Sequence, residues 1–199
     1  MHRMAKGTIT RERILDQALR DASLVGLEGL SLGKLAEEVE MSKSGIFAHF
    51  GSKEELQKQV LGAAAEKFGG IVVKPALTAP RGLPRVRAMF EGWLRWERDV
   101  SVPGGCVFTH AAVELDDRPG PVRDALAAWQ RTWRDMLARA ATIAVEERHF
   151  REDLDTQQFS FRLMGIIFVY YNSKRLLEDP LAEVHARAAF ESLVEWASL

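Results

Sequence analysis

Apolar residues recur along this chain at intervals of three and four, which is the spacing of one face of an α-helix. No segment alternates apolar and polar residues with the period of a β-strand. The pattern predicts an all-α protein, with a first helix that begins near Thr10 and ends at Gly26. The apolar stripe of this helix consists of Ile14, Leu15, Ala18, Leu19 and Ala22.

Two short helices and a long one are predicted next. Ser31 and Ser42 are placed to cap the short helices, at about 32–39 and 43–49, which a turn of three residues separates. The sequence SKEE at 52–55 is a capping box that opens a helix to about residue 68. Two short helices joined by a tight turn and packed on a longer first helix are typical of a helix-turn-helix domain.

The remainder of the chain predicts five further helices, at about 84–101, 105–115, 121–148, 156–178 and 180–198. The stretch 74–84 is rich in proline and glycine and reads as a break between helices. Nine helices in two domains are therefore expected, a helix-turn-helix domain at 1–52 and a helical domain at 53–199.

The overall charge indicates neither nucleic acid nor membrane as a partner. There are 27 Lys and Arg against 28 Asp and Glu, and residues 1–60 hold nine of each sign, so DNA binding would require charges segregated on one face. The only cysteine, Cys106, excludes an internal disulfide and favours a reducing, cytoplasmic setting. No signal peptide and no stretch long enough to span a membrane is expected.

The second short helix has the polarity of a DNA-reading helix. Ile46 and Phe50 fall on its inner face, whereas Lys43, Ser44 and His49 fall on its outer face. Lys53, in the first turn of the next helix, is placed to clamp a phosphate. Four further basic residues could reach flanking phosphates or a minor groove, namely Arg3, Lys6, Arg11 and Arg13.

The run LAEEVEMSKSGIFAHFGSKEEL at 35–56 resembles the DNA-binding signature of the tetracycline-repressor-like (TetR) family of bacterial transcription regulators. The resemblance implies a nine-helix fold, a homodimer, a palindromic operator and a small-molecule effector, with no cofactor and most often a repressor role. Phe47 stands where the family usually has tyrosine, so a hydroxyl contact to phosphate is lost. The expected DNA-facing residues are Ser31, Ser42, Lys43, Ser44, Gly45, Phe47, His49 and Lys53.

Large apolar and aromatic residues are concentrated in the helices after residue 84. Each by itself reads as core. The resemblance implies that several of them line an effector cavity, which their composition makes apolar or aromatic. The candidate effector-binding residues are Phe90, Trp93, Trp96, Cys106, Phe108, His110, Trp129, Trp133, Met136, Phe168 and Tyr171.

Cys106, His110 and Glu114 recur at intervals of four residues on one predicted helix. This row leaves open an enzyme, a metal site or a redox-sensing thiol as alternatives. Residues in line along a helix are about 6 Å apart per four residues by rise alone, which disfavours the converging geometry that catalysis needs. No HExxH pattern is present, so no metal is predicted.

The last two predicted helices suggest self-association. The penultimate helix has apolar residues on two faces, and the last has a seam of small residues that permits close helix packing. Two such helices from each of two subunits would form a four-helix interface. The expected dimerisation residues are Phe159, Leu163, Ile166, Tyr170, Ala182, Ala186, Ala189 and Leu193.

Overall fold

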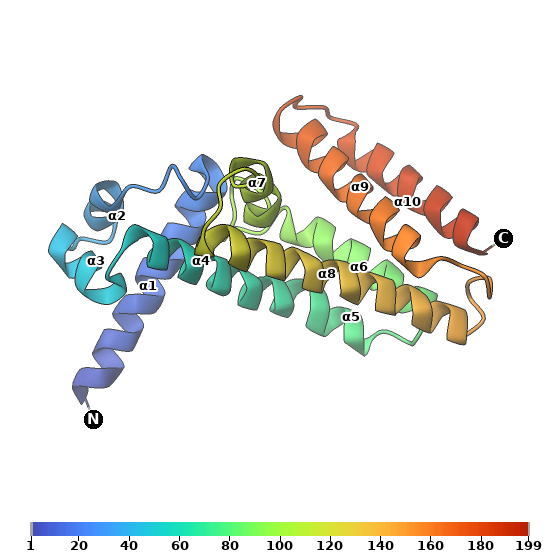
Figure 1. The fold of residues 1–199 in the computed structure, drawn as a ribbon, viewed down its shortest axis with the longest axis horizontal. Helices are drawn as coiled ribbons and strands as arrows, with labels where there is room; N and C mark the ends of the chain where they lie inside the picture. The colour runs from blue at the N-terminus through green and yellow to red at the C-terminus, as the bar shows by residue number, and fades with distance from the viewer. Residues whose placement is uncertain (1, 199) are drawn as a thin grey trace. The chain divides into compact units, whose positions relative to one another are not determined.

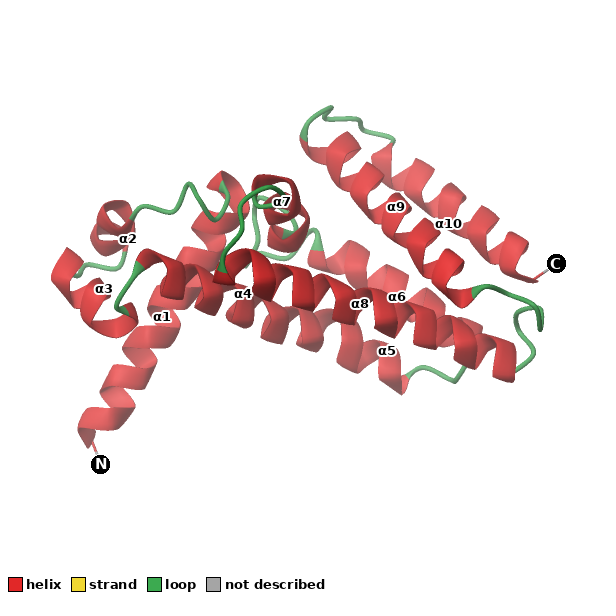
Figure 2. Ribbon diagram, viewed as in Figure 1, coloured by secondary structure: helices red, strands yellow, loops and turns green. Residues whose placement is uncertain are grey.

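The computed structural model describes the backbone of residues 2–198 and the side chains of residues 11–198, and this range contains helices and no strand (Figures 1 and 2). If the uninterrupted run α4–η1–α5 is counted once, residues 2–198 form nine helices, which confirms the predicted all-α fold. In order the elements are α1 (His2–Val25), α2 (Leu32–Glu38), α3 (Lys43–Phe50), α4 (Lys53–Phe68), the π-helix η1 (Gly69–Val73), α5 (Lys74–Thr78), α6 (Leu83–Trp96), α7 (Val107–Glu114), α8 (Pro121–Glu146), α9 (Thr156–Arg175) and α10 (Ala182–Ser198).

Three parts of the helix assignment differ clearly from the prediction, and one of them is α6, which ends at Trp96 rather than near residue 101. The first helix begins at His2 rather than near Thr10, because no proline interrupts residues 2–9 and one glycine costs a helix only about 1 kcal/mol. The stretch 74–78 is helical although it was expected to be irregular. Pro75 lies in the first turn of α5, where its missing N–H is tolerated, and the helix ends just before Ala79–Pro80.

The chain divides into two compact units, one of Met1–Lys67 with Glu97–Ala128 and the other of Phe68–Trp96 with Trp129–Leu199. In the first unit the predicted stripe of α1 forms the core, since Ile14, Ala18, Leu19 and Ala22 are fully buried. The helices α2 and α3 pack on one another, and α2 packs on α1. This arrangement holds the two short helices on a rigid support.

In the second unit, α6 is fixed to α9 and α10 by aromatic contacts. The rings of Phe90 and Phe190 stack with centroids 4.1 Å apart, and Trp93 meets Tyr170 edge to face at 5.0 Å. Ion pairs between α6 and α10 (Arg87 with Glu191, Arg187 with Glu91) border this contact. Among the described residues no helix is both long enough and apolar enough to cross a membrane.

Candidate nucleic-acid interface

The two short helices begin where their predicted N-cap residues place them. The Ser31 hydroxyl accepts the Lys34 N–H at 3.4 Å, and the Ser42 hydroxyl accepts the Gly45 N–H at 3.1 Å. Between the helices Glu40 takes a left-handed conformation (φ 57°), which costs about 1 kcal/mol for a residue with a Cβ. The resulting tight turn fixes the direction of α3 relative to α2.

The outer face of α3 combines polar side chains with one phenyl ring and is free of acidic residues. Ile46 and Phe50 are buried against the first unit's core, as predicted. On the opposite face Lys43 and Ser44 are exposed, and the side chain of Phe47 is 57% exposed. The sequence of α3, KSGIFAHF, carries no carboxylate, so the even balance of charges over residues 1–60 does not extend to this helix.

Two arginines predicted to reach DNA make hydrogen bonds inside the first unit. The Arg11 guanidinium donates to Gln59 Oε1 at 2.6 and 3.1 Å and lies 5.4 Å from the Phe50 ring centroid. Arg13 Nη2 donates to the Val39 carbonyl at 2.6 Å. Both side chains therefore tie α1 to its neighbours in this structure, and contact of either with a phosphate stays a prediction. The side chains of Arg3 and Lys6 lie outside the described residues.

Lys53 has a structural partner that the sequence did not indicate. Its ammonium donates to the Glu28 carbonyl at 2.6 Å, and Gln57, one turn along α4, donates to the Leu27 carbonyl at 2.8 Å. The α1–α2 turn is thus held from α4. Lys53 is still half-buried at the N-terminus of α4, where the Ser52 hydroxyl caps the helix by accepting the Glu55 N–H at 3.0 Å.

The same turn is held from α7 by Glu114. Its two carboxylate oxygens accept the N–H groups of Leu27 at 2.8 Å and Glu28 at 2.9 Å. Gly26 has a φ of 79°, and a Cβ there would lie 2.5 Å from Glu114 Oε1, so only glycine fits at the end of α1. We call the segment Leu27–Glu28, bonded from both α4 and α7, the clamped turn.

A carboxylate pair links α1 to α2. Asp21 is 9% exposed, and its burial, reinforced by the neighbouring Glu38, raises its pKa from 3.8 to about 6. The hydrogen bond with Asp21 lowers the pKa of Glu38. Gln17 Nε2 donates to both, at 3.0 Å to Asp21 and 3.2 Å to Glu38. Near neutral pH both carboxylates are therefore ionised and repel one another across the α1–α2 contact.

We expect Asp21→Asn to stabilise the protein by about 1 kcal/mol at pH 8 and by less than half as much at pH 5. The folded chain binds the Asp21 proton more tightly than the unfolded chain does, so wild-type stability falls as pH rises from 3.8 to about 6. Asparagine removes that cost and donates to Glu38. Urea unfolding at both pH values tests this, with the exposed Glu66→Gln as control; equal gains at the two pH values would contradict it.

The predicted effector residues of the second unit fall into two aromatic groups. Trp96, Trp129 and Trp133 converge edge-on upon Phe68, with ring centroids 5.7, 5.1 and 4.9 Å away. Sequence reasoning missed Phe68, although its place as the last residue of the predicted fourth helix was a usable signal. Phe90 and Trp93 instead belong to the contact of α6 with α9 and α10. Three further candidates are half-buried, namely Met136, Phe168 and Tyr171.

The remaining effector candidates, Cys106, Phe108 and His110, belong to the first unit. Cys106 is 2% exposed and precedes α7 as its N-cap residue, and its N–H donates to Glu97 Oε2 at 3.3 Å. The Glu114 carboxylate accepts hydrogen bonds from the clamped turn, so the acidic residue of the Cys–His–acid row has a structural role. Among the described residues no group of three or more His, Cys, Asp or Glu could hold a metal ion.

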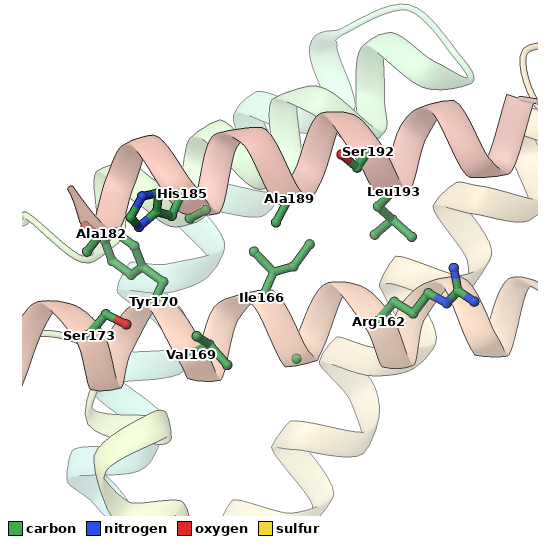
Figure 3. A pocket seen from close by; sticks show the side chains of 12 residues that line it. Arg162, Ile166, Val169, Tyr170, Ser173, Ala182, His185, Ala189, Ser192 and Leu193 are labelled. Atoms are coloured by element: carbon green, nitrogen blue, oxygen red, sulfur yellow. The ribbon is translucent and has the colours of Figure 1, made fainter. Parts of the chain in front are cut away.

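A groove of about 580 Å³ runs between α9 and α10 (Figure 3). Six of the eight predicted dimerisation residues line it: Ile166, Tyr170, Ala182, Ala186, Ala189 and Leu193. Phe159 and Leu163 do not, since they are 0% and 1% exposed within the second unit. Their apolar face of α9 covers this unit's own core, so they are unavailable to a partner. The groove residues that were not predicted are Arg162, Gly165, Val169, Ser173, His185 and Ser192.

A helix-turn-helix whose capped second helix exposes a lysine and a serine and carries no acidic residue has the features of a DNA-binding regulator. Residues 14–60 match the family model described as bacterial regulatory proteins, tetR family, and residues 82–190 match the tetracyclin repressor-like C-terminal domain. The chain belongs to the tetR family of bacterial regulators, which confirms the resemblance seen in the sequence. No curated protein matches it.

Solved structures with the same fold share little sequence with this chain. A TetR regulator from Chloroflexus aurantiacus J-10-FL is 22% identical with a TM-score of 0.85, over 96% of both chains. A putative regulator from Saccharomonospora viridis in complex with choline is 20% identical with a TM-score of 0.82, over 94% of this chain and 96% of that one. AibR, solved with isovaleryl coenzyme A and operator DNA, is 22% identical with a TM-score of 0.70, over 89% and 96%.

Proposed function

We propose that this protein is a homodimeric transcription regulator that represses from a palindromic operator and is released by a small apolar or aromatic effector. The observation that carries the proposal is α3, whose inner face is buried while Lys43, Ser44 and Phe47 stay exposed. Residues 1–52 would form the DNA-binding domain and residues 53–199 the ligand-binding and dimerisation domain.

In this proposal each α3 enters a major groove, and the two grooves lie about 34 Å apart, one turn of DNA. Ser42 and Gly45 start the helix, so their backbone comes close to the DNA. Ser31, His49 and Lys53 contact the flanking strand. Each α3 is short and capped within its own subunit, so the distance between the two α3 helices depends on the dimer interface.

The groove between α9 and α10 supports dimerisation by these two helices. Its lining is mostly small or apolar, and Phe161 and Val169 on α9 are 64% and 66% exposed. Exposed apolar side chains on the same helix as an apolar groove favour a surface that a partner covers. A second copy of the chain, related by a two-fold axis, would cover both helices with the same two helices.

The aromatic groups of the second unit support an apolar or aromatic effector. Two structures of the same fold were solved with small molecules, one with choline and one with isovaleryl coenzyme A together with operator DNA. An effector acts through its different affinities for the DNA-competent form and the released form. The clamped turn, bonded from both α4 and α7, would transmit a shift of either helix to α1 and α2.

We expect Lys53→Ala to weaken binding to all operator sequences alike and to reduce the slope of log K against log salt by about one unit. A lysine at the N-terminus of α4 neutralises one phosphate without reading a base. Fluorescence anisotropy over a salt series measures the slope, and thermal unfolding of the variant separates this effect from the loss of the Glu28 contact. An unchanged slope would contradict the phosphate role.

The proposed function itself is tested by selection from a random double-stranded DNA library. The expected result is enrichment of a palindrome that binds two protomers in a salt-dependent manner. Failure to enrich any palindrome, while the protein is folded and dimeric, would instead favour a helical adaptor without DNA binding.

A further inference from the structure

The first turn of α2 and the exposed face of α3 together line a hollow of about 590 Å³. Lys43 reaches across it: a Cβ built on Gly33 would lie 2.8 Å from Lys43 Cε and 3.3 Å from Lys43 Nζ. The lysine side chain therefore occupies the space that a side chain at position 33 would take. The hollow is lined by Ser31, Leu32, Gly33, Lys43, Ser44 and Phe47.

The lining combines one cation with exposed apolar surface. Lys43 supplies an ammonium with three donors, and Phe47, one helical turn further along α3, supplies a phenyl ring that is 57% exposed. A phosphate could use the ammonium and the hydroxyls of Ser31 and Ser44, but it would leave the exposed phenyl ring without a favourable contact. In a major groove, guanine offers the acceptors O6 and N7, and thymine offers a C5 methyl group. The hollow fits a guanine beside a thymine better than it fits a phosphate.

Resting on the DNA-binding function proposed above, we propose that Gly33 is a specificity-determining residue that lets Lys43 read a guanine while Phe47 contacts the methyl group of a neighbouring thymine. Gly33 acts because it has no side chain that would displace the end of Lys43. It leaves room beside α2, so the end of the Lys43 side chain lies next to the Gly33 backbone. Each operator half-site then contains a G and a T in adjacent positions under the N-terminus of α3.

Gly33 offers a test that does not depend on damage to the fold. The atom that a new Cβ would displace is the flexible end of Lys43, and alanine favours a helix more than glycine does. Gly33→Ala is therefore expected to keep or raise the unfolding temperature while it moves the lysine. A change in DNA preference in this variant comes from the position of Lys43.

The experiment is selection from a random double-stranded DNA library at fixed salt with the full chain and three variants. Wild type is expected to enrich a palindrome with a G and an adjacent T in each half-site. Lys43→Ala loses the preference for G, with discrimination falling by about tenfold, and Phe47→Ala loses the preference for T. Gly33→Ala changes the base preferred at the guanine position. Lys58→Ala, which removes a positive charge from α4, enriches the wild-type palindrome.

The possible failures are distinguishable. If wild type enriches no palindrome, the proposed function fails. If Gly33→Ala enriches the same palindrome as wild type, the function stands and the role of Gly33 is overturned. If Lys43→Ala weakens all sequences equally, Lys43 contacts a phosphate, and the specificity role is likewise overturned.

Discussion

A chain that carries Gly165→Glu together with Ala189→Glu is expected to be monomeric at micromolar concentration and to lose operator binding. Both residues line the α9–α10 groove, and a Cβ at Gly165 would meet no atom within 4 Å. Ala189 is exposed, so both glutamates fit the separate subunit. In a two-fold interface the two substitutions bury four unpaired carboxylates. At several kcal/mol for each buried charge, the dimer dissociation constant should rise by at least about 1,000-fold.

Sedimentation equilibrium measures the dissociation constant, and anisotropy with the selected operator measures binding. Gly62→Glu is the matched control, because Gly62 lies exposed on α4 and its Cβ would also meet no atom within 4 Å. This variant should remain dimeric and bind DNA. A double variant that stays dimeric, or a wild-type chain that is monomeric at micromolar concentration, would refute the α9–α10 interface.

Glu114→Ala is expected to lower the free energy of unfolding by about 3 kcal/mol and the melting temperature by about 8 °C. The substitution leaves the N–H groups of Leu27 and Glu28 without the carboxylate that accepts both. Hydrogen bonds to a charged acceptor are worth about 1.5–3 kcal/mol each, and water reaching the turn recovers part of the loss. The clamped turn also loses its connection to α7, so operator affinity should fall as well.

Two further variants calibrate this result. Glu114→Gln keeps one oxygen acceptor, so its loss of stability should be about half that of alanine. Glu66→Ala removes an exposed carboxylate from α4 and should change stability by less than about 0.5 kcal/mol. Urea unfolding gives all three values. Equal effects for Glu114→Ala and Glu66→Ala would show that the clamp does not stabilise the turn.

The aromatic residues show what the spacing of apolar residues along one helix can predict and what it cannot. Spacing along single helices correctly indicated that Trp129 and Trp133 share a face, and the structure places both against Phe68. The same reasoning assigned Phe159 and Leu163 to an interface, although they are buried in their own unit. A helix that is apolar on two sides does not indicate which side its own chain covers, because that depends on helices distant in sequence.

The sequence by itself determined the helices, their caps and the family, because these depend on residues within one turn of each other. Ser31, Ser42 and Ser52 each bond to an N–H three residues ahead. Only the tertiary structure decided the roles of Arg13 and Glu114, whose partners lie 26 and 86 or 87 positions away. Periodicity shows which face a charged side chain occupies, but its partner is set by packing between distant segments.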